Sequence, residues 1–265
     1  MKKMLAVLMA MVMMFSIVGC GAGDDGDSKA KTDMEYVKEK GTLVVGITEF
    51  DPMDYKDANG AWIGFDADMA KVFAESLGVK VEFQEIDWDN KVFELDGKTI
   101  DCVWNGMTLN DEVKSAMACT NPYCNNQQIV IVPADKADQY QTEESLADLT
   151  FAVESGSAGE KVAQEMNLKT TPVKDQASAL MEVAAGTSDA AIIDSLMAAA
   201  MVGEGTGYDK LTYTVGLSDE EYGVGFRKES DLVDAFNDFM KKAYDDGSMQ
   251  STAEQYGVQA ALIAQ

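Results

Sequence analysis

The 265-residue chain contains no histidine, only four prolines and only four cysteines. Without histidine it cannot build a Ser-His or Cys-His nucleophile or bind a metal through imidazole. Basic residues are also scarce, with 21 Lys and Arg against 46 Asp and Glu, and the net charge is -25. So acidic a surface disfavours nucleic acid and anionic lipid and slightly favours cationic or zwitterionic solutes, although an acidic shell without a functional role is commoner. The composition therefore argues against most enzymes and against nucleic-acid binding.

The N-terminal residues have the pattern of a secretory signal. Lys2 and Lys3 precede an apolar run over residues 4–18, and Ile17-Val18-Gly19-Cys20 resembles the lipobox of bacterial lipoproteins. This resemblance implies cleavage before Cys20 and acylation of its thiol, for instance by palmitate. A secretory signal that happens to end near a cysteine is the alternative. We therefore expect a signal peptide over residues 1–19, a lipidated tether over 20–31 and folded chain from about Thr32.

The remaining cysteines form an odd set. If Cys20 is acylated, Cys102, Cys119 and Cys124 are left, so a complete disulfide framework is excluded. Cys119 and Cys124 could bridge across a turn, or all three could remain free thiols. The sequence leaves both alternatives open.

Short β-branched runs alternate with helical patterns from Thr42 onward, which is typical of βαβ units around a largely parallel sheet. Late in the chain, amphipathic helices are predicted over 232–244 and 251–256. The predicted strands are 42–47, 79–85, 101–105, 128–132, 150–153, 190–193, 211–215 and 222–226.

Two helices have recognisable ends. Asp66 is predicted to cap a helix over 67–77 that Gly78 ends, and Asn110 to cap a helix that runs through Ala118. Four apolar residues of the first helix recur on one face and should be buried, namely Met69, Val72, Phe73 and Leu77.

Several ordered segments together resemble one protein family. They are GTLVVGITEF and the DPMDYKDANGAWIGFDADMAKVFAESLGVKVEF that follows it, then DCVWNGMTLNDEVKSAMACTNPY, and later YGVGFRKES before an amphipathic helix. Over residues 41–256 the chain resembles the polar amino-acid-binding proteins of bacterial ABC importers, also called solute-binding protein family 3. This resemblance implies an α/β type II periplasmic-binding-protein fold, in which two crossing hinge strands join two lobes. Lobe one would comprise 32–125 and 217–265, and lobe two 126–216.

The resemblance also implies which residues contact the ligand. In lobe one these are Phe50, which would stack on the ligand, and Asn105, Gly106 and Thr108 after the third strand. Trp104 should point the other way, into the core. These strand ends suit the role, since ligands of open α/β sheets collect at the carboxyl ends of strands.

In lobe two the resemblance places Asp194 against the α-ammonium of an amino acid, with a charge-assisted bond. Capping the helix that starts at Ser195 is the alternative role for Asp194. Glu154, Ser157 and Ala158 belong to a strand-to-helix loop whose backbone N–H groups would hold a carboxylate.

The chain departs from the family pattern at two anion contacts. Val113 stands where relatives usually carry an arginine that clamps the α-carboxylate, and Ala158 replaces a frequent hydroxyl. Lys114 is about 100 degrees further round its helix, so it would reach the ligand only if the helix shifted. Either backbone donors hold the carboxylate alone, or the ligand sits differently, or it lacks an α-carboxylate.

Three further residues are weaker candidates for the cleft. Glu49 and Asp54 would add negative charge and favour a cationic amine or a basic amino acid, unless they lie at the surface. Trp62 could form part of the wall or cover the surface.

These observations predict a monomeric, lipid-anchored solute-binding protein on the outer face of the cytoplasmic membrane. It would bind a polar or basic amino acid and deliver it to an ABC permease and its ATPase, without catalysis, cofactor, metal or nucleic acid. The alternatives are binding of an amine or another cationic solute without an α-carboxylate, or a ligand-sensing lobe for a membrane receptor. An enzyme related to dehydratases of this fold would have few acid-base candidates beyond Asp194 and Glu154.

Overall fold

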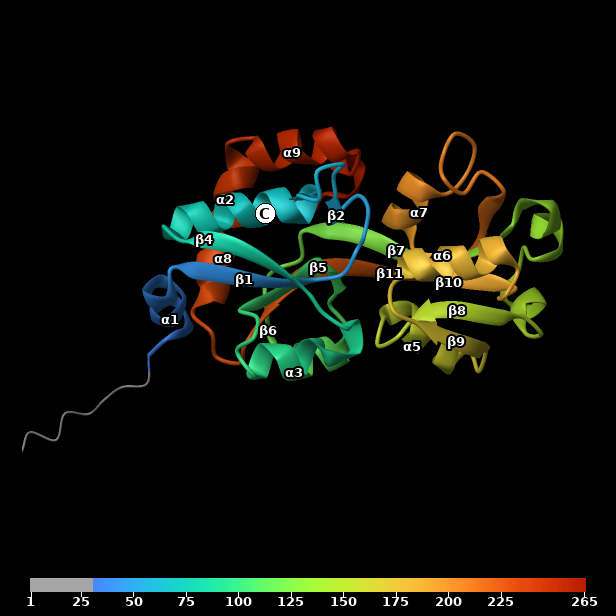
Figure 1. The fold of residues 1–265 in the computed structure, drawn as a ribbon, viewed down its shortest axis with the longest axis horizontal. Helices are drawn as coiled ribbons and strands as arrows, with labels where there is room; N and C mark the ends of the chain where they lie inside the picture. Colours follow the sequence, from blue (N-terminus) through green and yellow to red (C-terminus); the bar gives the residue numbers. More distant parts are fainter. Residues whose placement is uncertain (1–30) are drawn as a thin grey trace, which may run out of the picture. The chain divides into compact units, whose positions relative to one another are not determined.

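A mixed β-sheet runs through residues 31–265, which are the part of the chain that the computed structural model describes (Figure 1). The predicted signal peptide, Cys20 and all of the predicted tether before Lys31 lie outside these residues. No helix of residues 31–265 is both long enough and apolar enough to cross a membrane. The same residues contain no group of three or more acidic or cysteine side chains that could hold a metal ion.

The strand order across the described sheet is β4-β1-β5-β11-β7-β10-β8-β9, and β6 pairs with β11. A separate hairpin is formed by β2 (Tyr55–Lys56) and β3 (Trp62–Ile63). The sheet strands are β1 (Thr42–Ile47), β4 (Lys80–Glu85), β5 (Cys102–Thr108), β6 (Ala118–Cys119), β7 (Cys124–Pro133), β8 (Thr150–Glu154), β9 (Lys169–Val173), β10 (Ala190–Asp194) and β11 (Leu211–Phe226).

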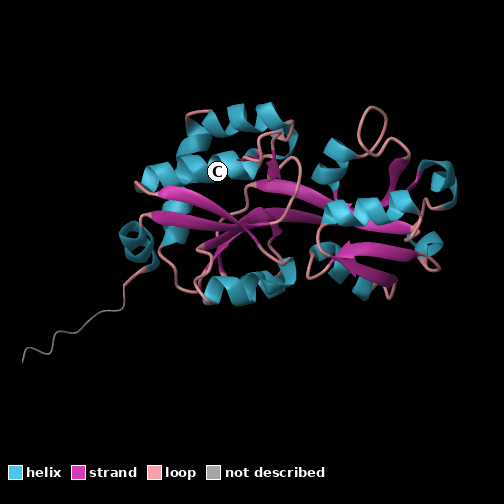
Figure 2. Cartoon of the chain, in the orientation of Figure 1, coloured by secondary structure: helices cyan, strands magenta, loops and turns pink. Residues whose placement is uncertain are grey.

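The helices cover both faces of this sheet (Figure 2). A 3₁₀ turn at Trp88–Asn90 leads into α3, and others lie at Ala134–Gln139, Glu143–Leu146 and Gln259–Ala261. The α-helices are α1 (Asp33–Lys40), α2 (Phe65–Leu77), α3 (Lys91–Asp96), α4 (Asp111–Ala116), α5 (Ala158–Glu165), α6 (Gln176–Ala185), α7 (Ser195–Met201), α8 (Leu232–Asp245) and α9 (Ser248–Tyr256).

Two long strands connect the ends of the sheet. β7 and β11 pair antiparallel from Leu211 opposite Pro133 to Tyr222 opposite Cys124, with irregular register near Gly216. The sequence predicted two strands in place of β11, because the polar residues 218–221 interrupt the apolar pattern while the backbone pairing continues. The two strands join the β4-β1-β5 end, here called the first half, to the β10-β8-β9 end, the second half (Figure 1). The lobe boundaries near 125 and 216 remain a prediction.

The first half is held together by an aromatic core. The ring of Trp104 lies 4.7 Å from that of Phe236 and 6.3 Å from that of Phe73, so the prediction that Trp104 points into the core is confirmed. Met69 and Phe73 of α2 are also buried. The same expectation was wrong for Val72, which is 50% exposed, because the buried face of α2 is turned toward Ala67, Ala70 and Ala74.

The predicted role of Asp66 is also corrected. Helix α2 begins at Phe65 with Gly64 as its N-cap residue, and Asp66 lies buried inside the first turn. Its carboxylate accepts hydrogen bonds from the backbone N–H of Gly106 and from the Tyr123 hydroxyl, both at 2.7 Å. Burial raises the pKa of Asp66 to about 7. Asp66 therefore anchors the end of β5 rather than capping a helix.

The prediction for Asn110 is confirmed at the start of the helix. Its side-chain oxygen accepts a hydrogen bond from the N–H of Val113 at 2.9 Å and so caps α4. The helix ends at Ala116 rather than Ala118, because residues 118–119 form β6 beside β11. The three cysteines of the described residues, Cys102, Cys119 and Cys124, are free thiols.

Candidate functional site

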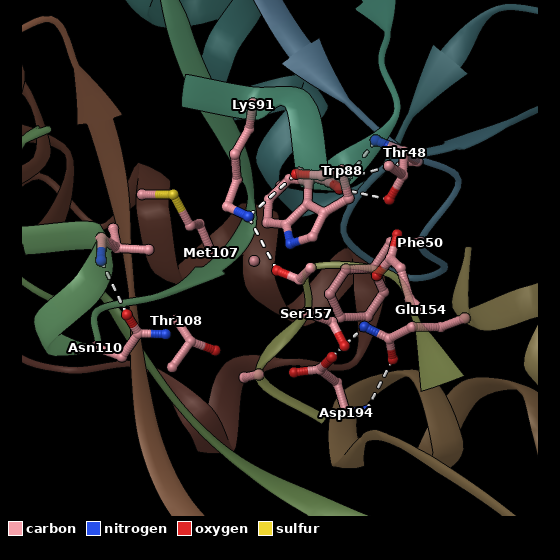
Figure 3. Close-up of a pocket in the computed structure, with 16 residues that line it drawn as sticks. Thr48, Phe50, Trp88, Lys91, Met107, Thr108, Asn110, Glu154, Ser157 and Asp194 are labelled. Carbon is pink, nitrogen blue, oxygen red and sulfur yellow. Dashed lines mark hydrogen bonds between the residues drawn. The ribbon is translucent and has the colours of Figure 1, made fainter. Parts of the chain in front are cut away.

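A cavity lies between the two halves, where the carboxyl ends of β5, β8 and β10 face one another (Figure 3). The space between its walls is about 400 Å³, a figure that includes the open mouth. Its walls are formed by Thr48, Phe50, Trp88, Lys91, Asn105, Gly106, Met107, Thr108, Asn110, Val113, Glu154, Gly156, Ser157, Ala158, Gln176 and Asp194.

Eight predicted site residues all lie on these walls, although they are far apart in the sequence. Their predicted contacts with a ligand remain predictions. They are Phe50, Asn105, Gly106, Thr108, Glu154, Ser157, Ala158 and Asp194.

The three weaker candidates do not line the cavity. Glu49 is exposed, because it alternates with the inward-facing Phe50. Asp54 is completely buried behind the wall, where it accepts a hydrogen bond from the side-chain amide of Asn105 at 2.7 Å. Trp62 lies on β3, with Lys56 Nζ 4.6 Å from its ring, so it covers the surface of the first half.

The first-half wall is rigidly supported. The Asn105 side-chain oxygen accepts from the N–H and the hydroxyl of Thr48, at 2.9 and 2.8 Å, and its amide donates to Thr48 and Asp54. Asn105 therefore fixes the wall and has little bonding capacity left for a ligand. Next to it, Gly106 has φ 54°, and a Cβ there would lie 2.5 Å from the ring of Phe50. Only glycine allows the Phe50 ring to lie this close to the strand end.

Asp194 lies at the end of β10, 4% exposed, with its carboxylate surrounded by neutral donors. Its Oδ1 accepts from the Tyr222 hydroxyl at 2.6 Å, from the Gln128 amide at 3.0 Å and from Asn126, while Oδ2 accepts from Gln176. Asp194 occupies the N-cap position of α7, but its side chain makes no capping hydrogen bond. Burial raises its pKa, and these hydrogen bonds partly offset the effect.

A second carboxyl group shares these donors. Glu220 of β11 accepts from the Asn126 amide at 2.6 Å and from the Gln128 amide at 2.8 Å. Burial, and then the charge of Asp194, raise the pKa of Glu220 to about 8. Near neutral pH, Glu220 therefore keeps its proton.

Glu154, at the end of β8, is the second acidic group of the cavity wall. It is 3% exposed, and its Oε1 has no hydrogen-bond partner among the described residues. Burial is the main cause that raises the pKa of Glu154 to about 8, followed by the charges of Asp194 and Asp175. At neutral pH Glu154 is therefore mostly protonated.

The sequence reasoning missed Trp88 and Lys91, which the turn after β4 brings to the cavity. Lys91 is 8% exposed, and its Nζ donates to the carbonyl oxygens of Trp88 at 3.1 Å and Gly156 at 3.0 Å (Figure 3). Burial lowers its pKa. Lys91 is the one cationic side chain of the cavity wall within residues 31–265. The missed signal was the segment Trp88–Lys91, which follows a predicted strand as Gly106 and Thr108 do.

The structure also locates Val113, which stands at the family's arginine position, and the neighbouring Lys114. Val113 is buried and lines the cavity, so an apolar side chain stands at this point of the wall. Lys114 is exposed and does not line the cavity.

Gly156 of the second half lies against the backbone of Asp89 in the first half. It has φ 72°, and a Cβ there would lie 2.6 Å from the Cα of Asp89. We expect Gly156→Ala to weaken ligand binding by about tenfold or more, because the backbone at Asp89 cannot make room for the added Cβ. A tenfold loss corresponds to about 1.4 kcal/mol. Calorimetric titration would measure this. The matched control is Gly186→Ala, whose Cβ would meet nothing within 4 Å although its φ is also positive. Equal losses in both variants would contradict the close-approach account.

The fold and the cavity together define a binding protein for a small polar solute. The sequence profile of the bacterial extracellular solute-binding proteins, family 3, matches residues 43–259. The chain belongs to this family.

Relatives match over nearly the whole chain. The arginine-binding extracellular protein ArtP of Bacillus subtilis is 26% identical over 265 residues, which cover 97% of this chain and 98% of ArtP. The L-cystine-binding protein TcyJ of Escherichia coli is 29% identical over 229 residues, covering 84% and 85% of the two chains. A mutant of ArgBP from T. maritima superposes with a TM-score of 0.80 at 30% identity, covering 85% of this chain and 99% of ArgBP. These alignments extend across both halves, so the relatives share the whole fold.

Proposed function

We propose that the cavity binds one basic amino acid, which the protein delivers to an ABC permease and its ATPase. At the level of the family, the function is the binding of polar or basic amino acids for ABC uptake, and the protein is not an enzyme. A cyclohexadienyl dehydratase of Pseudomonas aeruginosa is 27% identical, but over 171 residues that cover 62% of this chain.

The observation that carries the proposal is the charge pattern of the cavity wall. The wall has two acidic side chains, Asp194 and Glu154, and one cationic side chain, Lys91. A basic amino acid has the complementary pattern, with two cationic groups and one carboxylate. Asp194 would bind the α-ammonium, and the unpartnered Oε1 of Glu154 would accept from the side-chain cation. Phe50 and Trp88 would pack against the aliphatic part of the ligand.

The names of several relatives support this choice of ligand. ArtP is an arginine-binding protein, and ArgBP from T. maritima has been solved in an arginine-bound form with a TM-score of 0.74 at 32% identity. An ABC uptake transporter substrate-binding protein from Streptococcus pneumoniae, solved with bound histidine, superposes with a TM-score of 0.78 at 27% identity. The other candidate is an amine without an α-carboxylate, which the apolar Val113 favours.

The chain is an extracellular solute-binding protein of the bacterial type. We further propose that Cys20 carries the lipid that anchors it to the outer face of the cytoplasmic membrane, as the Ile17–Cys20 pattern indicates. Mass spectrometry of the membrane-extracted protein would test this, with acyl chains on a peptide that begins at Cys20 as the supporting result. A Cys20→Ala variant that remains membrane-bound would count against the anchor.

Thermal-shift screening would test the ligand class. At a ligand concentration 100 times its Kd, binding stabilises the native state by about 2.7 kcal/mol. For a protein of this size, that corresponds to a rise in Tm of about 5 to 10 °C. We expect such a rise with arginine, lysine, ornithine or histidine, and none with glutamate. The absence of a shift across all amino acids and amines would contradict the proposal.

A further inference from the structure

We propose that Lys91 binds the α-carboxylate of the ligand and thereby makes the site select amino acids over the corresponding amines. This inference rests on the proposed function. It assigns the carboxylate contact to α3, whereas the sequence reasoning sought it at the strand-to-helix loops and on α4.

The first observation is that Lys91 is a buried cation without an ion pair. No carboxylate oxygen of residues 31–265 lies within 4.0 Å of its Nζ, although the side chain is 8% exposed. Buried charges in proteins are normally paired, because an unpaired charge loses its hydration without compensation. The acidic group of the cavity that acts on it most strongly is Glu154, which holds its proton near neutral pH. An anion in the cavity would supply the missing partner.

The second observation is the bonding capacity of the Lys91 ammonium. An ammonium group has three N–H donors, and two of them bind the carbonyl oxygens of Trp88 and Gly156. These two bonds hold the amine at the cavity wall and leave one donor for a ligand (Figure 3). Next to Gly156, α5 begins at Ala158, and the N–H groups of its first turn favour a negative group at the same place.

The third observation concerns the position of Lys91 relative to Val113. Both residues line the cavity, and both also line an adjoining groove with Asn110, Gly156 and Ser157. The cation and the apolar residue therefore belong to the same part of the wall. A carboxylate that finds no donor at Val113 can be met by Lys91 without a shift of α4, which Lys114 would require.

The test compares amino acids with their decarboxylated amines in the purified protein and in Lys91→Met. The probe pairs are L-arginine with agmatine, L-histidine with histamine, and L-cystine with cystamine, each measured by calorimetry. The wild type should prefer the amino acid of its best pair by about 100-fold, a typical ratio for a buried charge contact. In Lys91→Met this preference should fall to within a few-fold, with the affinity for the amine nearly unchanged.

Two further variants make the outcomes distinguishable. Lys91→Gln keeps amide donors for the carbonyls of Trp88 and Gly156 but loses the charge, so it should also lose the preference. Lys114→Met, a lysine outside the cavity, should keep it. The inference is overturned if Lys91→Met and Lys91→Gln retain the preference, or if they weaken acid and amine equally, which would make Lys91 a bridge between the halves only. A wild type that binds an amine but no amino acid would overturn both this inference and the proposed function.

Discussion

Replacing Asp194 with asparagine is expected to weaken binding of a basic amino acid by about 100-fold or more while the protein stays folded. Asp194 is the wall carboxylate that the surrounding donors keep in place, and its pairing with the α-ammonium would be a buried charge contact, for which losses of 2 to 5 kcal/mol are typical. Calorimetric titration with L-arginine and L-lysine would measure the loss, and circular dichroism would confirm folding.

Asparagine is a better test than alanine at this position. Alanine would leave the Tyr222 hydroxyl and the Gln176 amide without this acceptor, and each unsatisfied buried donor costs about 1 to 3 kcal/mol of stability. Asn126 and Gln128 would keep only Glu220 as an acceptor. Asparagine keeps one acceptor oxygen and removes the charge. Thr212→Ala is the control variant, because Thr212 lies far along β11 from the cavity wall and its replacement should leave binding as in the wild type. Unchanged affinity in Asp194→Asn would assign the ammonium contact to another group.

The second large effect concerns pH. Burial raises the pKa of Glu154 to about 8, so this carboxyl must lose its proton before it can pair with a cationic side chain. Ligand binding therefore releases a proton at neutral pH, and affinity must rise with pH. We expect the affinity for L-arginine to rise by up to about tenfold per pH unit between pH 6 and pH 8, and to level off above that range.

A matched variant separates Glu154 from the other acids. In Glu154→Gln the pH dependence should become much shallower, and the affinity for L-arginine at pH 8 should fall by about 30-fold or more. An amino acid with a neutral side chain, such as L-glutamine, should show little change between the wild type and this variant. An affinity for L-arginine that stays constant or falls from pH 6 to pH 8 would rule out the pairing with Glu154.

The sequence allowed much of the fold to be predicted, because most strands are continuous apolar runs. β1 was predicted with its observed bounds, and β8 and β10 to within one residue. β11 was predicted as two strands. The residues between the halves pair through their backbone groups, and their side chains show no strand pattern. The strand β9 was missed because it is short and polar. It lies at the edge of the sheet, where only one neighbouring strand covers it.

The candidate site was predictable where residues end a strand, as Thr108, Glu154 and Asp194 do. It was not predictable where the chain turns through short irregular segments. Trp88 and Lys91 reach the cavity through a single 3₁₀ turn, and a lysine in such a place usually lies in solvent. Asp66 shows the converse, since a typical capping residue became a buried acceptor for Gly106 and Tyr123.

The most direct test of this account is a calorimetric titration of the protein at pH 8 with L-arginine, L-lysine, L-histidine, L-glutamine and L-glutamate. A cavity with two acidic groups and one cation should bind at least one of the basic amino acids tightly at this pH, and it should not bind glutamate. Preferential binding of glutamate, or of no amino acid at all, would contradict the charge complementarity on which the account depends.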